Sequence, residues 1–318
     1  MHQLLTANGP GRDPGHATVS KVMTAAEAVG RFVTPGATVG MGGQNINRCP
    51  TALAHEVVRQ GIGDLTVVGC NLSLPVDLLA AAGQIRRTEQ GSGNLERYGV
   101  LYTWRRKVER GEIEVKDYSH LSMATRFLGG AMGLPFMPTR SLLGSSVLDK
   151  HLGDGEVRLL DDPWGAGPVV LLQTLQPDVS LIHASLADTE GNVVIDGVTS
   201  HEIDMVRASR YTVVSVEEVV PAGTFGDRPE SVTISGAYVS AVVAQPFGAY
   251  PTSVYRRYDY DDVEIRGYQE HAKAGDEQVA GWLQKNVLWA KDFEEYLTQR
   301  DPDGAVRRAL AEQMRSVL

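Results

Sequence analysis

The stretch Thr-Val-Gly-Met-Gly-Gly-Gln-Asn-Ile-Asn-Arg-Cys-Pro, residues 38–50, indicates how this chain of 318 residues folds. It begins as a short apolar strand, continues as a loop that opens on two adjacent glycines, and leads into a helical stretch at residues 51–59. Gly42 and Gly43 allow a backbone to pass close to a ligand and to expose its N–H groups. Pro50 is typical of a helix start, and the N-terminus of a helix attracts negative charge. The stretch therefore predicts a strand–loop–helix unit that holds a phosphate, a carboxylate or a developing oxyanion.

The rest of the chain continues this alternation of strands and helices. The apolar run at 64–69 is typical of a strand that is covered on both faces, and the alternating order favours a parallel sheet in an open, αβα-layered α/β fold. Thr24 is predicted to cap one helix, and Thr199 or Ser200 another. We expect a flexible arm at 1–20, followed by a single domain at 21–318 with a helical C-terminal region and a polar loop at 90–100. Helices are predicted at 23–33, 75–82, 102–110, 117–133, 200–208 and 263–297, and strands at 37–41, 169–172, 179–183, 193–195, 211–216 and 237–244.

Composition and charge exclude several classes of function. The net charge is −9 and no basic stripe is present, so we expect no nucleic-acid partner. No apolar run is long enough to span a bilayer, and the first twenty residues lack the apolar core of a signal peptide. Two cysteines in a chain of this length do not form a disulfide scaffold, which favours the cytoplasm. No Cys/His cluster has the spacing of metal ligands, so no metal is expected.

Polar side chains follow the predicted strands at the edge where ligands bind in open parallel sheets. Asn45, Asn71 and Ser73 are expected to face one crevice, which suits a small carboxylate or a thioester, although such residues also cap turns. Cys49 is either a nucleophile or a small buried hydrophobe, and we favour the second. For Glu217 and the neighbouring Glu218 we favour a structural carboxylate at a strand end.

The glycine loop resembles a signature of class I coenzyme A transferases. Their loop reads Gly-Gly-Phe-x-x-x-Gly-x-Pro, and this chain has Gly42-Gly43-Gln44-x-x-x-Arg48-x-Pro50, with glutamine in place of the aromatic residue and arginine in place of the third glycine. Further stretches, in the same order, are similar to the A (alpha) subunit of glutaconate-type CoA-transferases. They are residues 111–120, 133–146, 187–192 and 213–220, and the resemblance extends over residues 24–297.

This resemblance implies the αβα fold of the CoA-transferases and a place in an A/B pair, assembled as a heterotetramer. The implied reaction moves CoA from an acyl-CoA substrate to a free carboxylic acid. The B subunit supplies a glutamate that attacks the thioester, forms an anhydride with the acyl group and then becomes a glutamyl-CoA thioester. No stretch of this chain resembles the Ser-Glu-Asn-Gly context of that glutamate, so the chain alone is expected to be inactive.

The resemblance and the predicted crevice together give a set of candidate binding residues. Arg48 is expected to favour a dianionic or polar acyl group. Arg140 is expected either to pair with a substrate carboxylate or to form a structural salt bridge. The complete set of candidate substrate-binding residues is Gly42, Gly43, Gln44, Asn45, Arg48, Asn71, Ser73, Ser119 and Arg140.

His120 is the one candidate catalytic residue in this chain. Related hydrolases that open cyclic acyl-CoA compounds have a glutamate at the corresponding position, and an imidazole is able to act as a base or a hydrogen-bond donor. The alternative is a histidine that caps the following helix. Two other functions stay open: an acyl-CoA hydrolase on the same heteromeric scaffold, and a ligand-sensing module related to sugar-phosphate-binding regulators.

Overall fold

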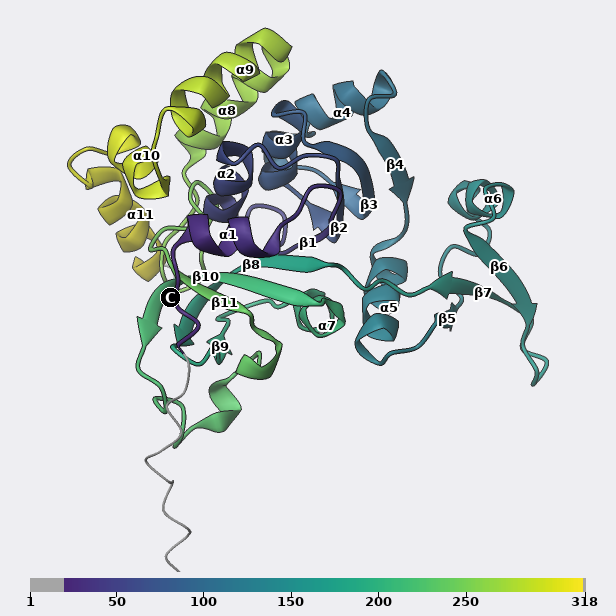
Figure 1. The fold of residues 1–318 in the computed structure, drawn as a ribbon. Coiled ribbons are helices and arrows are strands. Elements are labelled where there is room, and N and C mark those ends of the chain that lie inside the picture. Colours follow the sequence, from purple (N-terminus) through teal and green to yellow (C-terminus); the bar gives the residue numbers. More distant parts are fainter. Residues whose placement is uncertain (1–19, 317–318) are drawn as a thin grey trace, which may run out of the picture.

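The computed structural model describes residues 20–316 and contains a central parallel sheet covered by helices on both faces (Figure 1). The strand order is β11-β10-β8-β1-β2-β3-β4, and a short β9 pairs antiparallel with β8. The predicted α/β fold with a mostly parallel sheet is confirmed. The predicted arm at 1–20 lies, apart from its last residue, outside the described residues. The strands are β1 (Thr38–Met41), β2 (Leu65–Leu72), β3 (Ile85–Gly93), β4 (Glu114–Asp117), β8 (Val179–Asp188), β9 (Val193–Val194), β10 (Tyr211–Val220) and β11 (Ala241–Ala244).

The two faces of the sheet build two separate apolar cores. Val67 packs into one core and its neighbour Val68 into the other, as expected for a strand that is buried on both sides. The first core lies under α1 (Ala25–Phe32), α2 (Thr51–Arg59), α3 (Leu74–Ala81), α4 (Tyr102–Glu109), α8 (Asp262–Ala274) and α9 (Asp276–Leu283). The second lies under α5 (His120–Ala131) and α7 (Glu202–Ala208).

A C-terminal helical region packs against the start of α2. It comprises a π-helical turn (Gln284–Leu288), α10 (Phe293–Arg300) and α11 (Ala305–Ser316). Phe293 and Tyr296 are buried in a third apolar cluster together with Ala52 of α2. The aromatic residues at these two positions therefore serve packing. No helix within residues 20–316 is long and apolar enough to cross a membrane.

The side on which successive strands join the sheet changes at β1. The chain proceeds from β1 through β2 and β3 to β4 on one side, whereas β8 and the later strands add on the other side. The loops that leave β1 and β8 therefore diverge, and such a switch point opens a crevice at the carboxyl edge of a parallel sheet. This geometry places the glycine loop at the position where a ligand is expected.

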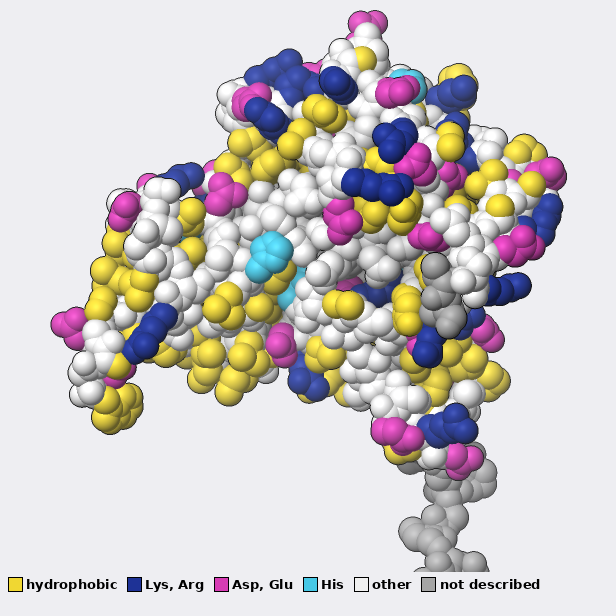
Figure 2. All heavy atoms as spheres, turned by 180° about the vertical axis from the view of Figure 1, so that it is seen from behind, with side chains coloured by type: hydrophobic (Ala, Val, Ile, Leu, Met, Phe, Trp, Pro, Cys, Tyr) yellow, Lys and Arg dark blue, Asp and Glu magenta, His cyan; other side chains and the backbone are white. Residues whose placement is uncertain are grey.

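A small antiparallel sheet projects from the main body (right in Figure 1). It contains β5 (Phe136–Thr139), β6 (Val157–Asp161) and β7 (Pro168–Gln173), and α6 (Ser146–Gly153) precedes β6. Figure 2 shows apolar side chains gathered on this projection, at its left. The exposed residues there include Phe136, Leu159, Leu160 and Trp164.

Several sequence predictions differ from the structure. The predicted loop at 90–100 is wrong at its start, because β3 continues to Gly93 and pairs with both β2 and β4. The predicted helix at 117–133 begins only at His120, after β4. Thr199 and Ser200 do not cap α7: His201 is its N-cap, and the backbone carbonyl of Thr199 accepts from the Glu202 N–H instead. Thr24, in contrast, forms the predicted cap of α1.

Candidate functional site

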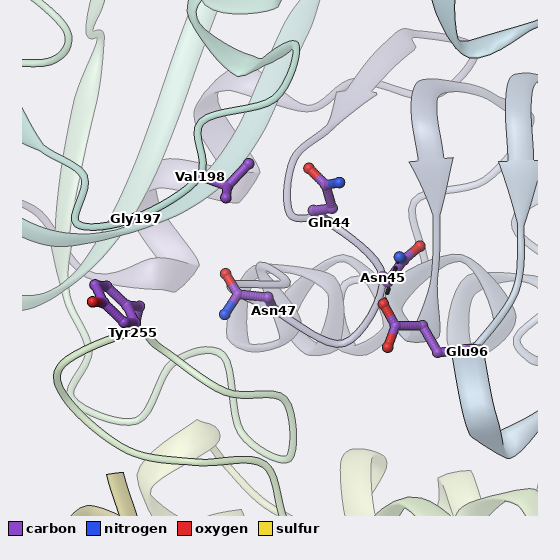
Figure 3. Close-up of a pocket in the computed structure, with 7 residues that line it drawn as sticks. All are labelled: Gln44, Asn45, Asn47, Glu96, Gly197, Val198 and Tyr255. Carbon is purple, nitrogen blue, oxygen red and sulfur yellow. Dashed lines mark hydrogen bonds between the residues drawn. The ribbon is translucent and has the colours of Figure 1, made fainter. Parts of the chain in front are cut away.

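A cavity of about 430 Å³ opens at the switch point of the sheet (Figure 3). One wall consists of side-chain amides on the loop that follows β1, and we call this cavity the amide pocket. The opposite wall comes from the segment after β9 and from the loop after β11. The lining residues are Gln44, Asn45, Asn47, Glu96, Gly197, Val198 and Tyr255.

Hydrogen bonds fix most of the polar wall. Asn45 donates from Nδ2 to the Glu96 carboxylate at 2.6 Å, and Asn47 donates to the Ser253 hydroxyl at 3.0 Å. The Oε1 atom of Gln44 is buried and has no hydrogen-bond partner in the described part of the chain. A buried acceptor without a donor is unfavourable, and a bound molecule reaches this one only when the Gln44 side chain turns toward the cavity.

The backbone of the glycine loop does not face the pocket in the way that the sequence suggests. The Gly42 N–H donates to the Leu181 carbonyl at 2.9 Å, and the Gly43 N–H donates to the Glu202 carboxylate at 2.9 Å. Protein acceptors therefore already occupy both N–H groups, and the expectation of an open anion site there is corrected. Gly43 is required for a different reason: its φ is +88° and a Cβ would lie 2.9 Å from the Cys49 Cα.

The N-terminus of α2 is also closed. The Thr51 N–H donates to the Cys49 carbonyl at 2.7 Å, and the Ala52 N–H donates to the Gly248 carbonyl at 2.9 Å. These contacts satisfy donors that an anion would otherwise bind. The expectation that this helix end holds negative charge is corrected as well.

Arg48 is completely buried and forms an ion pair with the buried Glu202. Its Nη1 atom also donates to the His183 carbonyl at 2.9 Å, and its Nη2 atom donates to the Val198 carbonyl at 2.7 Å. The guanidinium therefore does not line the amide pocket, and its charge is matched inside the protein. The expected contact of Arg48 with the acyl group is not present in this arrangement.

Arg48 instead joins the loops that form the pocket walls. Its side chain holds Val198 and, through Glu202, the backbone of Gly43. Its backbone N–H donates to the Ser253 carbonyl at 2.7 Å, and Ser253 lies two residues before Tyr255. Arg48 thus connects the loop after β1 to the segment at Val198 and to the loop at Ser253.

A second group of polar residues lies at the ends of β2 and β3 and at the start of α5, at the same edge of the sheet. Ser92 Oγ donates to Asn71 Oδ1, and it lies 2.9 Å from His120 Nε2. Because Ser92 donates its hydroxyl hydrogen to the asparagine oxygen, it accepts a hydrogen bond from His120, so Nε2 carries the ring hydrogen. The Nδ1 atom of this exposed imidazole then keeps its lone pair.

Close backbone approach brings His120 to this position. A Cβ on Gly91 would lie 2.6 Å from His120 Cδ2 and 2.9 Å from the Cys70 carbonyl oxygen. Only glycine at this point of β3 leaves room for the imidazole. Ser119 is the N-cap of α5 and bonds to Ser122 and Ser141, so the capping function belongs to Ser119 and not to His120.

The remaining candidates lie outside the amide pocket. Ser73 is the N-cap of α3, and its Oγ is buried without a partner among the described residues. Arg140 is exposed, donates to the Ala166 carbonyl at 3.0 Å and lies 4.0 Å from Asp162. These contacts belong to the projecting small sheet and match the structural alternative for Arg140.

Other titratable groups near the crevice are held neutral or paired. Burial raises the pKa of the Cys49 and Cys70 thiols to about 12, so both stay protonated, in agreement with the buried-hydrophobe interpretation. Burial lowers the pKa of His201 to about 4, so this ring is neutral at pH 7. Glu217 accepts from Tyr258 at 3.0 Å and lies 2.7 Å from the His183 ring, which fits the structural role favoured for it.

Sequence reasoning missed several residues that shape the site. Asn47 could have been predicted to line the site, because it lies in the glycine loop two positions after Asn45 and has the same side-chain amide. The sequence Gly91-Ser92-Gly93 also indicates a close approach of another chain segment, so Ser92 could have been predicted to lie at the site. Glu96, Glu202 and Tyr255 reach the site only through tertiary contacts, and no local pattern distinguishes them.

Comparisons with known proteins agree with this geometry. The family model described as "Coenzyme A transferase" matches residues 22–245. The chain is 31% identical to the A component of glutaconate CoA-transferase from Acidaminococcus fermentans, over 88% of this chain and 92% of that relative. It is 30% identical to the A component of 3-oxoadipate CoA-transferase from Pseudomonas knackmussii, over 87% and 97% respectively.

One solved structure and one further sequence relative show the same relation. The crystal structure of glutaconate coenzyme A-transferase from Acidaminococcus fermentans superposes with a TM-score of 0.84 at 30% identity, and the match covers 91% of this chain and 94% of that one. An uncharacterized protein from Archaeoglobus fulgidus is 34% identical over 87% of this chain, which spans 61% of that relative's length. The chain therefore belongs to the coenzyme A transferase family and is an A-type (alpha) member of it.

Proposed function

We propose that this chain is the A half of an enzyme that moves CoA between an acyl thioester and a carboxylic acid, and that a B-type partner supplies the glutamate nucleophile. The amide pocket carries this proposal. It lies at the switch point of the sheet and offers polar side chains for an acyl group. The pocket's own carboxylate, Glu96, is hydrogen-bonded to Asn45.

In the proposed reaction, the partner's glutamate attacks the thioester carbonyl while this chain holds the acyl group. Val198 and Tyr255 form the apolar side of the pocket, and the amides of Gln44 and Asn47 contact the polar part of the acyl chain. His120, whose Nδ1 keeps a lone pair, takes the proton of the CoA thiol when the sulfur attacks the anhydride, and returns it to the CoA thiolate that the acceptor carboxylate later displaces from the glutamyl thioester. The ion pair of Arg48 with Glu202 holds the two walls of the pocket in their relative positions.

The charge of the pocket indicates the kind of acyl group. Within the described residues its lining contains one carboxylate, Glu96, and no lysine or arginine. Arg48 cannot compensate, because Glu202 already neutralises it. A second carboxylate on the acyl chain would be repelled, whereas an uncharged polar group would lie beside the side-chain amides of the loop that follows β1. We therefore propose acyl groups that are polar but uncharged at the far end.

The small sheet supports the need for a partner. Phe136, Leu160 and Trp164 are about half exposed or more, and they lie in the part of the chain that projects from the body. Extended apolar surface of this kind is typical of contacts between protein chains. A partner that covered it would bury side chains that otherwise face water.

Assay of the assembled pair tests the proposed function. We expect the tagged chain, purified gently from its host, to carry a second chain of the same family. This complex should transfer CoA from hydroxyacyl-CoA to an added carboxylic acid, and the chain alone should not. Product analysis with and without the acid separates transfer from hydrolysis. CoA release at the same rate in water alone would replace the transferase with the hydrolase alternative.

A further inference from the structure

The amide pocket has two ends, and Tyr255 stands at the one that lies away from His120. Tyr255 and Gly197 line this end, and Asn45 and Glu96 line the other (Figure 3). Gly197 follows β9, which pairs with β8, whereas Glu96 follows β3, the strand that the His120 ring contacts. Since β8 and β3 lie on opposite sides of β1, an acyl group whose thioester is near His120 points its far end at Tyr255.

The ring of Tyr255 lies against the bare backbone of a glycine. Gly197 has a φ of +86°, and a Cβ there would lie 3.2 Å from Cδ1 of Tyr255. A larger residue at 197 would therefore be strained and would also crowd the ring. The tyrosine itself is 38% exposed, so the backbone turn that carries it determines where the ring stands.

This turn is closed by two backbone hydrogen bonds. The Val254 N–H donates to the Tyr258 carbonyl at 2.9 Å, and the Tyr258 N–H donates to the Val254 carbonyl at 3.0 Å. Both residues are buried, so they form the fixed base of the turn and Tyr255 lies between them in the chain. A displacement of Tyr258 therefore also displaces Tyr255.

Glu217 connects the base of the turn to the sheet. Its carboxylate accepts from the Tyr258 hydroxyl at 3.0 Å and from the Phe247 N–H at 2.8 Å, and the rings of Phe247 and Tyr258 stack with their centres 4.3 Å apart. On the side of the sheet, Oε1 of Glu217 lies 2.7 Å from Nε2 of His183 on β8. The Glu217 side chain is only 7% exposed, so a single carboxylate that is shielded from water joins the loop after β11 to two central strands.

We propose that Glu217 is a positioning residue for the acyl group. Through Tyr258 it holds the ring of Tyr255 at the far end of the amide pocket, and this ring limits the length of the acyl chain. The inference rests on the proposed function and narrows its substrates to acyl groups that are short as well as polar.

Titration calorimetry of the assembled complex measures this limit with two unreactive ligands, the thioether analogues of 3-hydroxybutyryl-CoA and 3-hydroxyoctanoyl-CoA. Tyr255→Ala should shift the ratio of the two dissociation constants about tenfold toward the longer ligand, because the space of the ring becomes available. Tyr258→Phe keeps the stacked ring but removes the hydroxyl that contacts Glu217, and it should shift the ratio in the same direction by less. Glu217→Gln, which weakens the same contact, should behave like Tyr258→Phe.

A double variant tests whether the effect passes through the Tyr255 ring. In the Tyr255→Ala background, Tyr258→Phe should not change the ratio further, since the ring that it positions is already absent. A general loss of stability would not depend on the background in this way. Tyr238→Phe serves as the matched control, because Tyr238 is exposed and does not line the pocket, and it should match the wild type.

Two results would overturn the inference: an unchanged ratio in Tyr255→Ala, or the same shift by Tyr258→Phe with and without the Tyr255 ring. Failure of the proposed function looks different. A complex that shows the expected shifts with the thioethers but transfers no CoA would leave the role of Glu217 standing and remove the transferase. Active transfer together with an unshifted ratio would do the reverse.

Discussion

Replacement of Glu202 by alanine should lower the free energy of unfolding by about 3–5 kcal/mol, because it leaves the buried Arg48 without a counter-ion. Both side chains are fully buried, and the same carboxylate accepts from the Gly43 N–H at 2.9 Å. The variant should also lose activity in the assembled enzyme, since Glu202 holds Gly43, next to the lining residue Gln44, and orients Arg48, which holds Val198 of the opposite wall. Urea denaturation of the purified chain, followed by circular dichroism, measures the change.

Two further variants test whether the unpaired charge of Arg48 causes the loss of stability. Glu230→Ala removes an exposed carboxylate and should stay within about 0.5 kcal/mol of the wild type. The double replacement Arg48→Met/Glu202→Leu should regain most of the lost stability, because no unpaired charge stays buried. A Glu202→Ala chain as stable as the wild type would show that this ion pair does not hold the loops together.

Replacement of His120 by alanine should reduce turnover of the assembled enzyme by about 10²–10⁴-fold, the usual contribution of a positioned acid or base. The reason is the hydrogen-bonded chain from Asn71 through Ser92, which leaves the lone pair on Nδ1. Turnover as a function of pH, with saturating acyl-CoA, is the measurement. Ser92→Ala should reduce turnover less, because it loosens the ring without removing it.

The variant His120→Gln separates proton transfer from simple positioning. Its amide N–H still reaches Ser92 but cannot exchange a proton in the same way, so it should be nearly as impaired as alanine. His271→Ala, an exposed histidine on α8, is the control and should behave like the wild type. Full activity of the glutamine variant would reduce His120 to a hydrogen-bonding residue.

The sheet and its layers could be predicted because their signals are local. The apolar run at 64–69 and the strand–glycine–helix order at 38–59 specify buried parallel strands, and Thr24 with Glu27 forms a capping box that is visible in the sequence. β3 was missed because its sequence, Ile-Arg-Arg-Thr-Glu-Gln-Gly-Ser-Gly, is polar. Its charges are matched by partners far along the chain, such as Arg126, which pairs with Glu89 at 2.9 Å.

The site was harder to predict than the fold. Gln44 and Asn45 line the cavity as the glycine loop suggests, and His120 stands at the same edge of the sheet. The prediction for Arg48 was wrong. A charged residue in a ligand-binding loop is expected to contact the ligand, but Arg48 pairs with a buried carboxylate instead. That partner, Glu202, lies 154 residues away, and only the folded chain brings the two together.

The location of the covalent CoA adduct shows which of the two chains carries the nucleophile. The assembled complex is incubated with acyl-CoA, the thioester intermediate is reduced with borohydride, and peptides of both chains are analysed by mass spectrometry. We expect a modified glutamate in the partner chain and an unmodified Glu96 in this one. Modification of Glu96, or of any residue in this chain, would contradict the division of the active site between two chains.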